Sequence, residues 1–196
     1  FNERSKLLIG RSLIILCLMI LFYVYLRLFR KQFYNSKRIV TLLLMMIVGF
    51  CVATSLIITH TSASLVYVIP FALLPIIIST FFDTRTALYA NYITIFISSL
   101  VVPSPFEFVL LQATAGMVTI SSLRDLSQRS QLIRTAIIIF FTYCLFFLGY
   151  GLTSDSSIFE VNWITFVFFL INGILLLFAY PFIYIIEQIF GFISNV

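Results

Sequence analysis

Side chains that could act as nucleophiles, general bases or metal ligands are few and far apart in this sequence of 196 residues. His60 is the only histidine, and nucleophilic catalysis needs the nucleophile and its base at one site. The cysteines, Cys17, Cys51 and Cys144, share no metal-ligand spacing, and each lies within an apolar run. No G-x-S-x-G motif or glycine-rich phosphate loop occurs. We therefore predict no catalytic, cofactor-binding or metal site in this segment.

Amide side chains interrupt three otherwise apolar stretches, at Asn91, Gln112 and Asn172. Polar groups in hydrocarbon are retained when they hydrogen-bond across helices or line a cavity. Interhelical hydrogen bonding is the simpler interpretation, and a ligand or signal pathway is the alternative. Asn91 and Asn172 lie near the middle of their stretches, so they could meet if the two helices are neighbours. We expect each to lie within hydrogen-bond reach of another helix and not to face lipid.

Long apolar segments must position these groups. The chain is 62% hydrophobic and 10% charged, whereas soluble domains carry about 25% charged residues. This composition predicts an all-α polytopic membrane protein, a seven-transmembrane helix bundle that forms one domain over residues 1–196. The expected spans cover about residues 7–28, 39–59, 63–82, 86–102, 106–123, 135–152 and 161–190. The polar segment 106–123 could alternatively be a re-entrant element.

The basic residues predict the orientation of the bundle. Nine of the 12 Lys and Arg residues fall in or at the edges of the first, third and fifth connections between spans, and the other three lie before or near the start of the first span. Cytoplasmic loops carry an excess of Lys and Arg. We therefore expect the N-terminus outside and the C-terminus in the cytoplasm. The connections hold Arg27, Arg30, Lys31, Lys37, Arg38, Arg85, Arg124, Arg129 and Arg134, and the N-terminal residues are Arg4, Lys6 and Arg11.

Small residues and prolines indicate local features of two early spans. Gly49 and Ala53 are four residues apart, a spacing that allows a neighbouring helix to approach closely. Pro70 and Pro75 each remove a backbone donor and predict kinks in residues 63–82. Asp83, which follows that segment, is a candidate N-cap for the next helix.

The last span contains two residues that could transmit a signal. Pro181 is interpreted as a packing kink or, alternatively, as a hinge that passes motion to whatever follows Val196. Glu187 lies six residues later and could form an ion pair with Arg85, Arg124 or Arg129. We name Asp83, Arg85, Pro181 and Glu187 as candidate signal-transmission positions.

Several stretches together resemble the membrane region of the bacterial seven-transmembrane HD family, whose best-known members are the PgpH-type cyclic-di-AMP phosphodiesterases. The stretches are residues 81–87 (FFDTRTA), 112–116 (QATAG), 121–124 (SSLR), 129–134 (RSQLIR), Tyr180-Pro181 and 187–192 (EQIFGF). The resemblance implies a bacterial inner-membrane location, a large extracellular domain before Phe1 and a cytoplasmic HD phosphohydrolase after Val196. It also implies that the catalytic site and its two divalent metal ions belong to that HD domain, with no cofactor in this segment.

The resulting functional hypothesis is a sensory or regulatory module that couples an extracellular domain to cytoplasmic cyclic-di-AMP hydrolysis. Its expected partners are the lipid bilayer, its own extracellular and HD domains and a second copy in a homodimer, without nucleic acid. The alternative is a small-molecule transporter or a vitamin-binding membrane subunit, with Asn91, Gln112 and Asn172 lining a substrate cavity. An intramembrane hydrolase is disfavoured because no nucleophile–base pair occurs.

Overall fold

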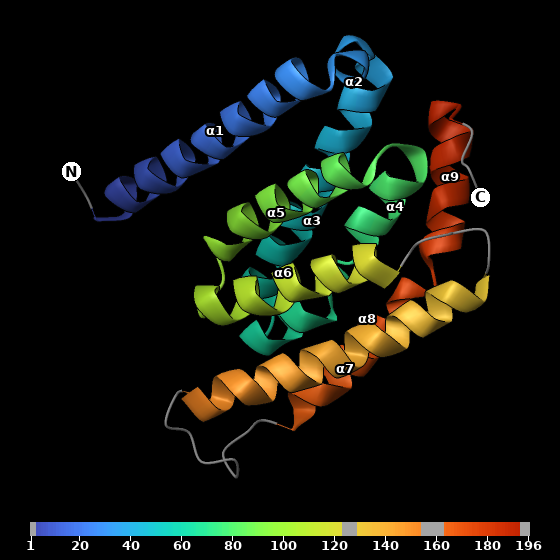
Figure 1. Ribbon diagram of the computed structural model, residues 1–196. Coiled ribbons are helices and arrows are strands. Elements are labelled where there is room, and N and C mark those ends of the chain that lie inside the picture. Colours follow the sequence, from blue (N-terminus) through green and yellow to red (C-terminus); the bar gives the residue numbers. More distant parts are fainter. Residues whose placement is uncertain (1–2, 123–128, 154–162, 193–196) are drawn as a thin grey trace.

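The computed structural model describes residues 3–122, 129–153 and 163–192, and the regular structure within these ranges is helical (Figure 1). This confirms the all-α fold class. The elements, in order, are α1 (Glu3–Phe29), α2 (Lys31–Asn35), α3 (Lys37–His60), the 3-10 helix η1 (Ala63–Val68), α4 (Leu73–Phe81), α5 (Thr84–Ser99), α6 (Pro105–Ser122), α7 (Arg129–Thr153), α8 (Ile164–Leu176) and α9 (Ala179–Phe190).

Four described helical segments are long and apolar enough to cross a membrane, and the bent pair α8–α9 makes up to five. They are Glu3–Phe29, Lys37–His60, Ala63–Phe81 and Ser130–Thr153. The chain is therefore a multi-pass membrane protein. Helix α5 has only 16 residues, and α6 is a continuous helix of 18 residues with several polar side chains. Both occupy predicted spans, so the count of seven spans and the orientation of the termini stay predictions.

Helix α5 lies at the centre of the N-terminal part of the bundle, where it packs against α1, α3, α4 and α6. Helix α7 packs against α6 and α8, and α8 in turn contacts η1. The N-terminal half of α1 projects away from the other helices (Figure 1), and the only buried residues of α1 are Phe22 and Leu26, in its second half. The interior is thus assembled around α5, α6 and the broken η1–α4 segment.

Residues 63–81 are broken at the first of their two prolines. Ile69 has the extended backbone (φ −66°, ψ 119°) that a following proline favours, and α4 begins only at Leu73. Pro75 lies in the first turn of α4, where backbone N–H groups have no partner within the helix. The kink predicted at Pro70 is therefore confirmed as a complete break. Pro75 is the third residue of α4, so the same break lies one turn before it, where a kink caused by Pro75 is expected.

The last predicted span is a bent helix pair. The axes of α8 and α9 differ by 45° across residues 177–178. In a straight helix the ring of Pro181 would clash with the carbonyl four residues earlier, that of Leu177. Leu177 is where α8 ends, and a backbone hydrogen bond from Phe182 to Phe178 (3.2 Å) resumes the helix. The packing kink predicted from Pro181 is confirmed, and it lies one turn before the proline.

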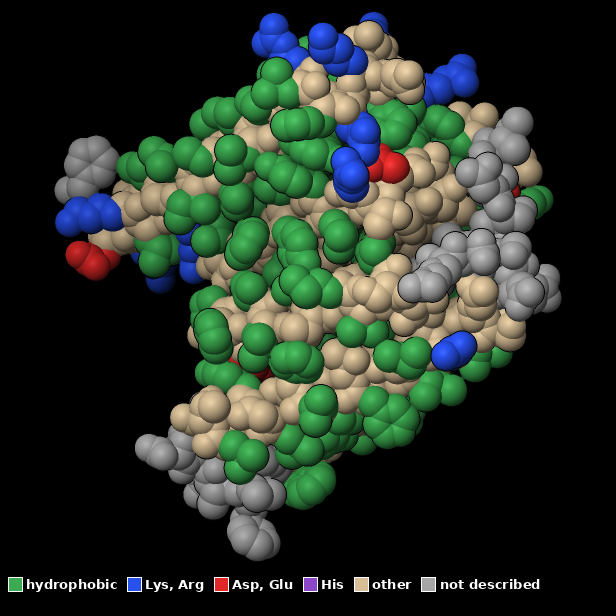
Figure 2. Space-filling view, in the orientation of Figure 1, with side chains coloured by type: hydrophobic (Ala, Val, Ile, Leu, Met, Phe, Trp, Pro, Cys, Tyr) green, Lys and Arg blue, Asp and Glu red, His purple; other side chains and the backbone are tan. Residues whose placement is uncertain are grey.

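Hydrophobic side chains cover most of the face seen in Figure 2, while Lys and Arg side chains gather at the end of the molecule where α2 lies. Many large apolar side chains of α1, α3, α7, α8 and α9 are exposed, including Leu28 (63%), Phe141 (65%) and Ile189 (67%). An apolar surface that is bordered by a basic end is typical of a protein surrounded by lipid.

Candidate functional site

Asn172, on α8, pairs with the proline break at the end of η1. Its Nδ2 donates hydrogen bonds to the carbonyl oxygens of Tyr67 (2.9 Å) and Ile69 (2.8 Å). In a continuing 3-10 helix the Tyr67 carbonyl would accept from residue 70, but Pro70 has no N–H. Asn172 is fully buried, so it supplies inside the bundle the donor that Pro70 lacks. Its predicted interhelical hydrogen bonding is confirmed.

Gln112 connects α6 to α7 through Tyr143. The Tyr143 hydroxyl donates a hydrogen bond to Gln112 Oε1 (2.7 Å), and both side chains are buried. The Tyr143 ring stacks on Phe169 of α8, with ring centroids 5.1 Å apart. Gln112 Nε2 and Asn172 Oδ1 have no hydrogen-bond partner among the described residues. The group therefore ties α6, α7 and α8 together and retains unused hydrogen-bonding capacity.

Asn91 lies apart from this group, between α5 and α6. It is fully buried and does not face lipid. Its Nδ2 lies so close to Gly116 of α6 that a Cβ added there would collide with it. Neither polar atom of its amide has a hydrogen-bond partner within the described ranges. The suggested meeting of Asn91 with Asn172 is therefore wrong as a hydrogen bond, because Asn91 packs against α6 while Asn172 pairs with η1.

Asp83 joins three helices at the end of the molecule where α2 lies. Its carboxylate accepts hydrogen bonds from the Thr86 backbone N–H (3.2 Å) and hydroxyl (2.6 Å), which confirms it as the N-cap of α5. It also accepts from Arg30 Nη2, between α1 and α2, at 2.6 Å. Burial opposes ionisation, but the hydrogen bonds from Thr86 and Arg30 outweigh it and lower the pKa of Asp83 below its ordinary value of 3.8. Arg85, two residues later, is exposed.

The end of the last helix packs beside this ion pair. The Phe192 ring, just after α9, lies 5.7 Å from that of Phe82, which in turn lies 5.2 Å from Phe33 of α2 (centroid distances). Phe82 directly precedes Asp83, which binds Arg30. We call these five residues the junction, since they join α2, the α4–α5 turn and the end of α9. Figure 1 shows these three segments at one end of the molecule.

The other two transmission candidates lie on α9. Pro181 is exposed in its first turn, and Glu187 is half-buried one turn before the end of the helix. The pairing of Glu187 with Arg85 stays a prediction, and the Arg124 and Arg129 side chains lie outside the described residues. The sequence analysis thus named one junction residue, Asp83, together with three residues whose transmitting role stays a hypothesis.

Groups for catalysis do not converge in the described part of the chain. No set of three or more His, Cys, Asp or Glu residues there could hold a metal ion. His60 is exposed at the end of α3. Cys17, Cys51 and Cys144 are free thiols. The polar contacts described above join helices to one another.

Sequence reasoning missed Tyr143, Arg30 and Phe192. In the sequence, Tyr143 is one of many aromatic residues. The one signal that distinguishes it is a polar hydroxyl group in the middle of the apolar stretch 135–152. In the sequence, Arg30 contributes only to the topology signal. Its partner is 53 residues away along the chain, and no local pattern reports such a pairing.

Comparison with protein families identifies a match over nearly the whole chain. The family model described as "7TM receptor with intracellular HD hydrolase" matches residues 5–194, nearly the whole chain. Comparisons with curated proteins and with solved structures gave no match.

Proposed function

Because the chain belongs to the family of 7TM receptors with an intracellular HD hydrolase, we propose that it is the sensory or regulatory membrane module of such an enzyme. It couples an extracellular domain, on the N-terminal side, to hydrolysis of cyclic-di-AMP by an HD domain on the C-terminal side. The enzyme is a PgpH-type phosphodiesterase of the bacterial inner membrane. Its HD domain holds two divalent metal ions and carries the catalytic residues, so this segment acts through position and not through chemistry.

One observation carries the proposal, namely the contact of Phe192 with Phe82 beside the Arg30–Asp83 ion pair. It connects the final helix to the turns after α1 and α4. A displacement of α1 or α4 therefore changes the surface against which the end of α9 rests. The chain continues from that end toward the proposed HD domain, so a change of packing there is transmitted directly.

The bend before Pro181 gives α9 a way to move separately from α8. Because Pro181 lacks a backbone N–H, one helical hydrogen bond is missing there, and the connection between α8 and α9 bends more easily than a continuous helix. A receptor of this kind needs two arrangements with different ligand affinities. We propose that they differ in the angle at residues 177–178 and in the contacts of the junction. A second copy completes the signalling unit as a homodimer.

The test is cyclic-di-AMP hydrolysis by the full-length protein in lipid nanodiscs with Mn²⁺. Pro181→Ala restores the missing donor and straightens the bend, and Glu187→Ala removes the charge at the end of α9. Both variants should change the rate relative to the parent, with unchanged expression. Phe106→Ala, at an exposed position at the far end of α6, is the matched control and should leave the rate unchanged.

The two parts of the proposal fail differently. Parental rates in both α9 variants, with and without a stimulus, would exclude transmission through α9 while leaving the substrate assignment intact. A parent that hydrolyses another cyclic dinucleotide, but not cyclic-di-AMP, would exclude the substrate and leave the transmission pathway open to test with the correct one.

A further inference from the structure

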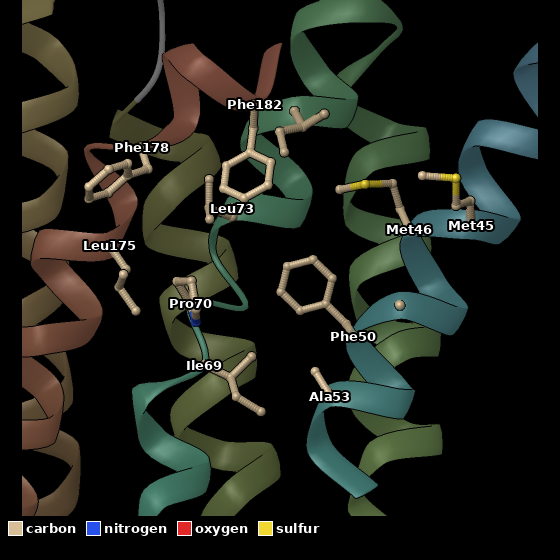
Figure 3. A pocket seen from close by; sticks show the side chains of 12 residues that line it. Met45, Met46, Phe50, Ala53, Ile69, Pro70, Leu73, Leu175, Phe178 and Phe182 are labelled. Atoms are coloured by element: carbon tan, nitrogen blue, oxygen red, sulfur yellow. The ribbon is translucent and has the colours of Figure 1, made fainter. Parts of the chain in front are cut away.

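An apolar groove of about 630 Å³ opens between α3 on one side and the η1–α4 break, α8 and α9 on the other (Figure 3). Its wall includes no charged side chain and none of the three amides expected to line a transporter cavity. Figure 3 shows Phe50 and Ala53 of α3 facing Pro70, Phe178 and Phe182 across the groove. The residues that line it are Met45, Met46, Gly49, Phe50, Ala53, Ile69, Pro70, Leu73, Ile77, Leu175, Phe178 and Phe182.

Gly49 is an open position in the wall of this groove. A Cβ added to it meets no atom within 4 Å, so none of the described helices packs against this position. Among the described residues, the close helix approach predicted from Gly49 and Ala53 does not occur at Gly49, whereas Ala53 packs against the apolar core. The small side chains instead leave space, and both residues line the groove.

A cation lies at one end of the same groove. Arg38 precedes Met45 by seven residues on α3, which places the two on one helix face about 10 Å apart along the axis. Its guanidinium lies beside Gly191, because a Cβ added to Gly191 would be 3.9 Å from Arg38 Nη1. Gly191 caps the end of α9. Arg38 thus lies on α3 near the end of α9, and its side chain is exposed.

We propose that the groove binds one acyl chain of an anionic phospholipid whose phosphate lies at Arg38. The apolar wall matches the hydrocarbon chain, and the exposed guanidinium matches the phosphate charge. From Met45 to Ala53 the groove follows α3 for about 12 Å, within the roughly 15 Å that one leaflet of a 30 Å hydrocarbon core provides. This site does not depend on the hydrolase function proposed above.

A helix of a second copy fits the groove less well. A helix is about 10 Å wide with its side chains and presents a regular surface, whereas the wall of this groove is irregular and built from side chains of several helices. An acyl chain is thinner and adapts to an irregular wall of Met and Phe side chains. Leu175 and Phe178 belong to the α8–α9 bend and Phe182 to α9, so a bound chain contacts both arms of the bend.

The test uses the full-length protein in phosphatidylcholine nanodiscs with a small fraction of photoactivatable lipid. Phosphatidylglycerol and phosphatidylcholine probes carry the same diazirine acyl chain, and adducts are mapped by proteolysis and mass spectrometry. The phosphatidylglycerol probe should label peptides containing residues 45–53 and 178–182 about fivefold more strongly, the preference expected for one cation near the membrane surface. In Arg38→Gln the two probes should label these peptides about equally.

Gly49→Phe places a ring in the groove without strain at its backbone and should abolish labelling of these peptides with both probes. Gly10→Phe is the matched control, since Gly10 is equally open but lies on the projecting half of α1, and it should label like the parent. Equal labelling by both probes in the parent, or parental labelling in Gly49→Phe, overturns the proposal. Cross-links from photo-methionine at Met45 or Met46 to another copy also overturn it and identify a protein helix as the occupant.

Discussion

Replacing Asn172 by leucine should weaken the bundle, because the proline break then loses its only described side-chain donor. The amide donates to the Tyr67 and Ile69 carbonyls at 2.9 and 2.8 Å. Leucine has nearly the same shape, so packing is conserved and the loss is that of the two hydrogen bonds. Interhelical hydrogen bonds in membrane proteins average about 0.6 kcal/mol, with a maximum near 1.7. A buried carbonyl without a partner costs about 1–3 kcal/mol.

At the break only the Tyr67 carbonyl loses its described donor, because the Ile69 carbonyl also accepts a hydrogen bond from the Phe71 backbone N–H (2.9 Å), so the cost of one unpaired carbonyl applies. We expect Asn172→Leu to lower the free energy of unfolding by about 1–3 kcal/mol. Steric trapping in bicelles measures this quantity for a membrane protein. Ile174→Ala, at a half-exposed position on the same helix, is the control and should change it by less than about 0.5 kcal/mol.

The mechanism itself is tested by adding Pro70→Ala. Alanine supplies an N–H and frees Ile69 from the restriction that a following proline imposes, so residue 70 can itself donate to the Tyr67 carbonyl. Asn172→Leu should then cost about 0.5–1 kcal/mol less than it does beside Pro70. A single-variant effect below 0.5 kcal/mol, or an equal cost in both backgrounds, would refute the idea that Asn172 replaces the donor missing from the proline.

Three further predictions concern helix contacts. Gly116→Ala should destabilise the bundle by about 1–3 kcal/mol, because the added methyl group collides with Asn91; Gly149→Ala, which meets no atom within 4 Å, should not. The pKa of Asp83 is lower in the folded protein than its ordinary value of 3.8, so the ionised side chain stabilises the fold above pH 3.8, and this stabilisation is lost as the pH falls below that value. The free energy of unfolding measured between about pH 5 and 2.5 should therefore depend less on pH in Asp83→Asn than in the parent. Phe192→Ala should increase amide hydrogen exchange in the last turn of α9 without affecting α8, since it removes the ring contact that holds that turn; equal exchange in parent and variant would contradict the junction.

The sequence by itself determined the features that depend on local covalent structure and composition. Long apolar runs require helices in lipid, because each backbone polar group must find its partner within the segment. Pro70 breaks a helix and Pro181 bends one at the preceding turn, since a proline lacks its N–H and clashes with the carbonyl four residues before it. Asp83 caps the helix that follows it for an equally local reason.

Only the tertiary structure decided which segments meet. Asn172 and Asn91 look alike in sequence, yet one completes the broken η1 and the other packs on Gly116. Gly49 has the spacing of a helix contact but opens a groove, because the nearby chain is turned aside at Pro70. Apolar packing is not directional. The hydrophobic pattern therefore predicts that an apolar helix face is covered, but it does not predict which helix covers it. That choice is made by the shapes of all the helices together, and it places Arg30 at Asp83 and Arg38 beside the end of α9.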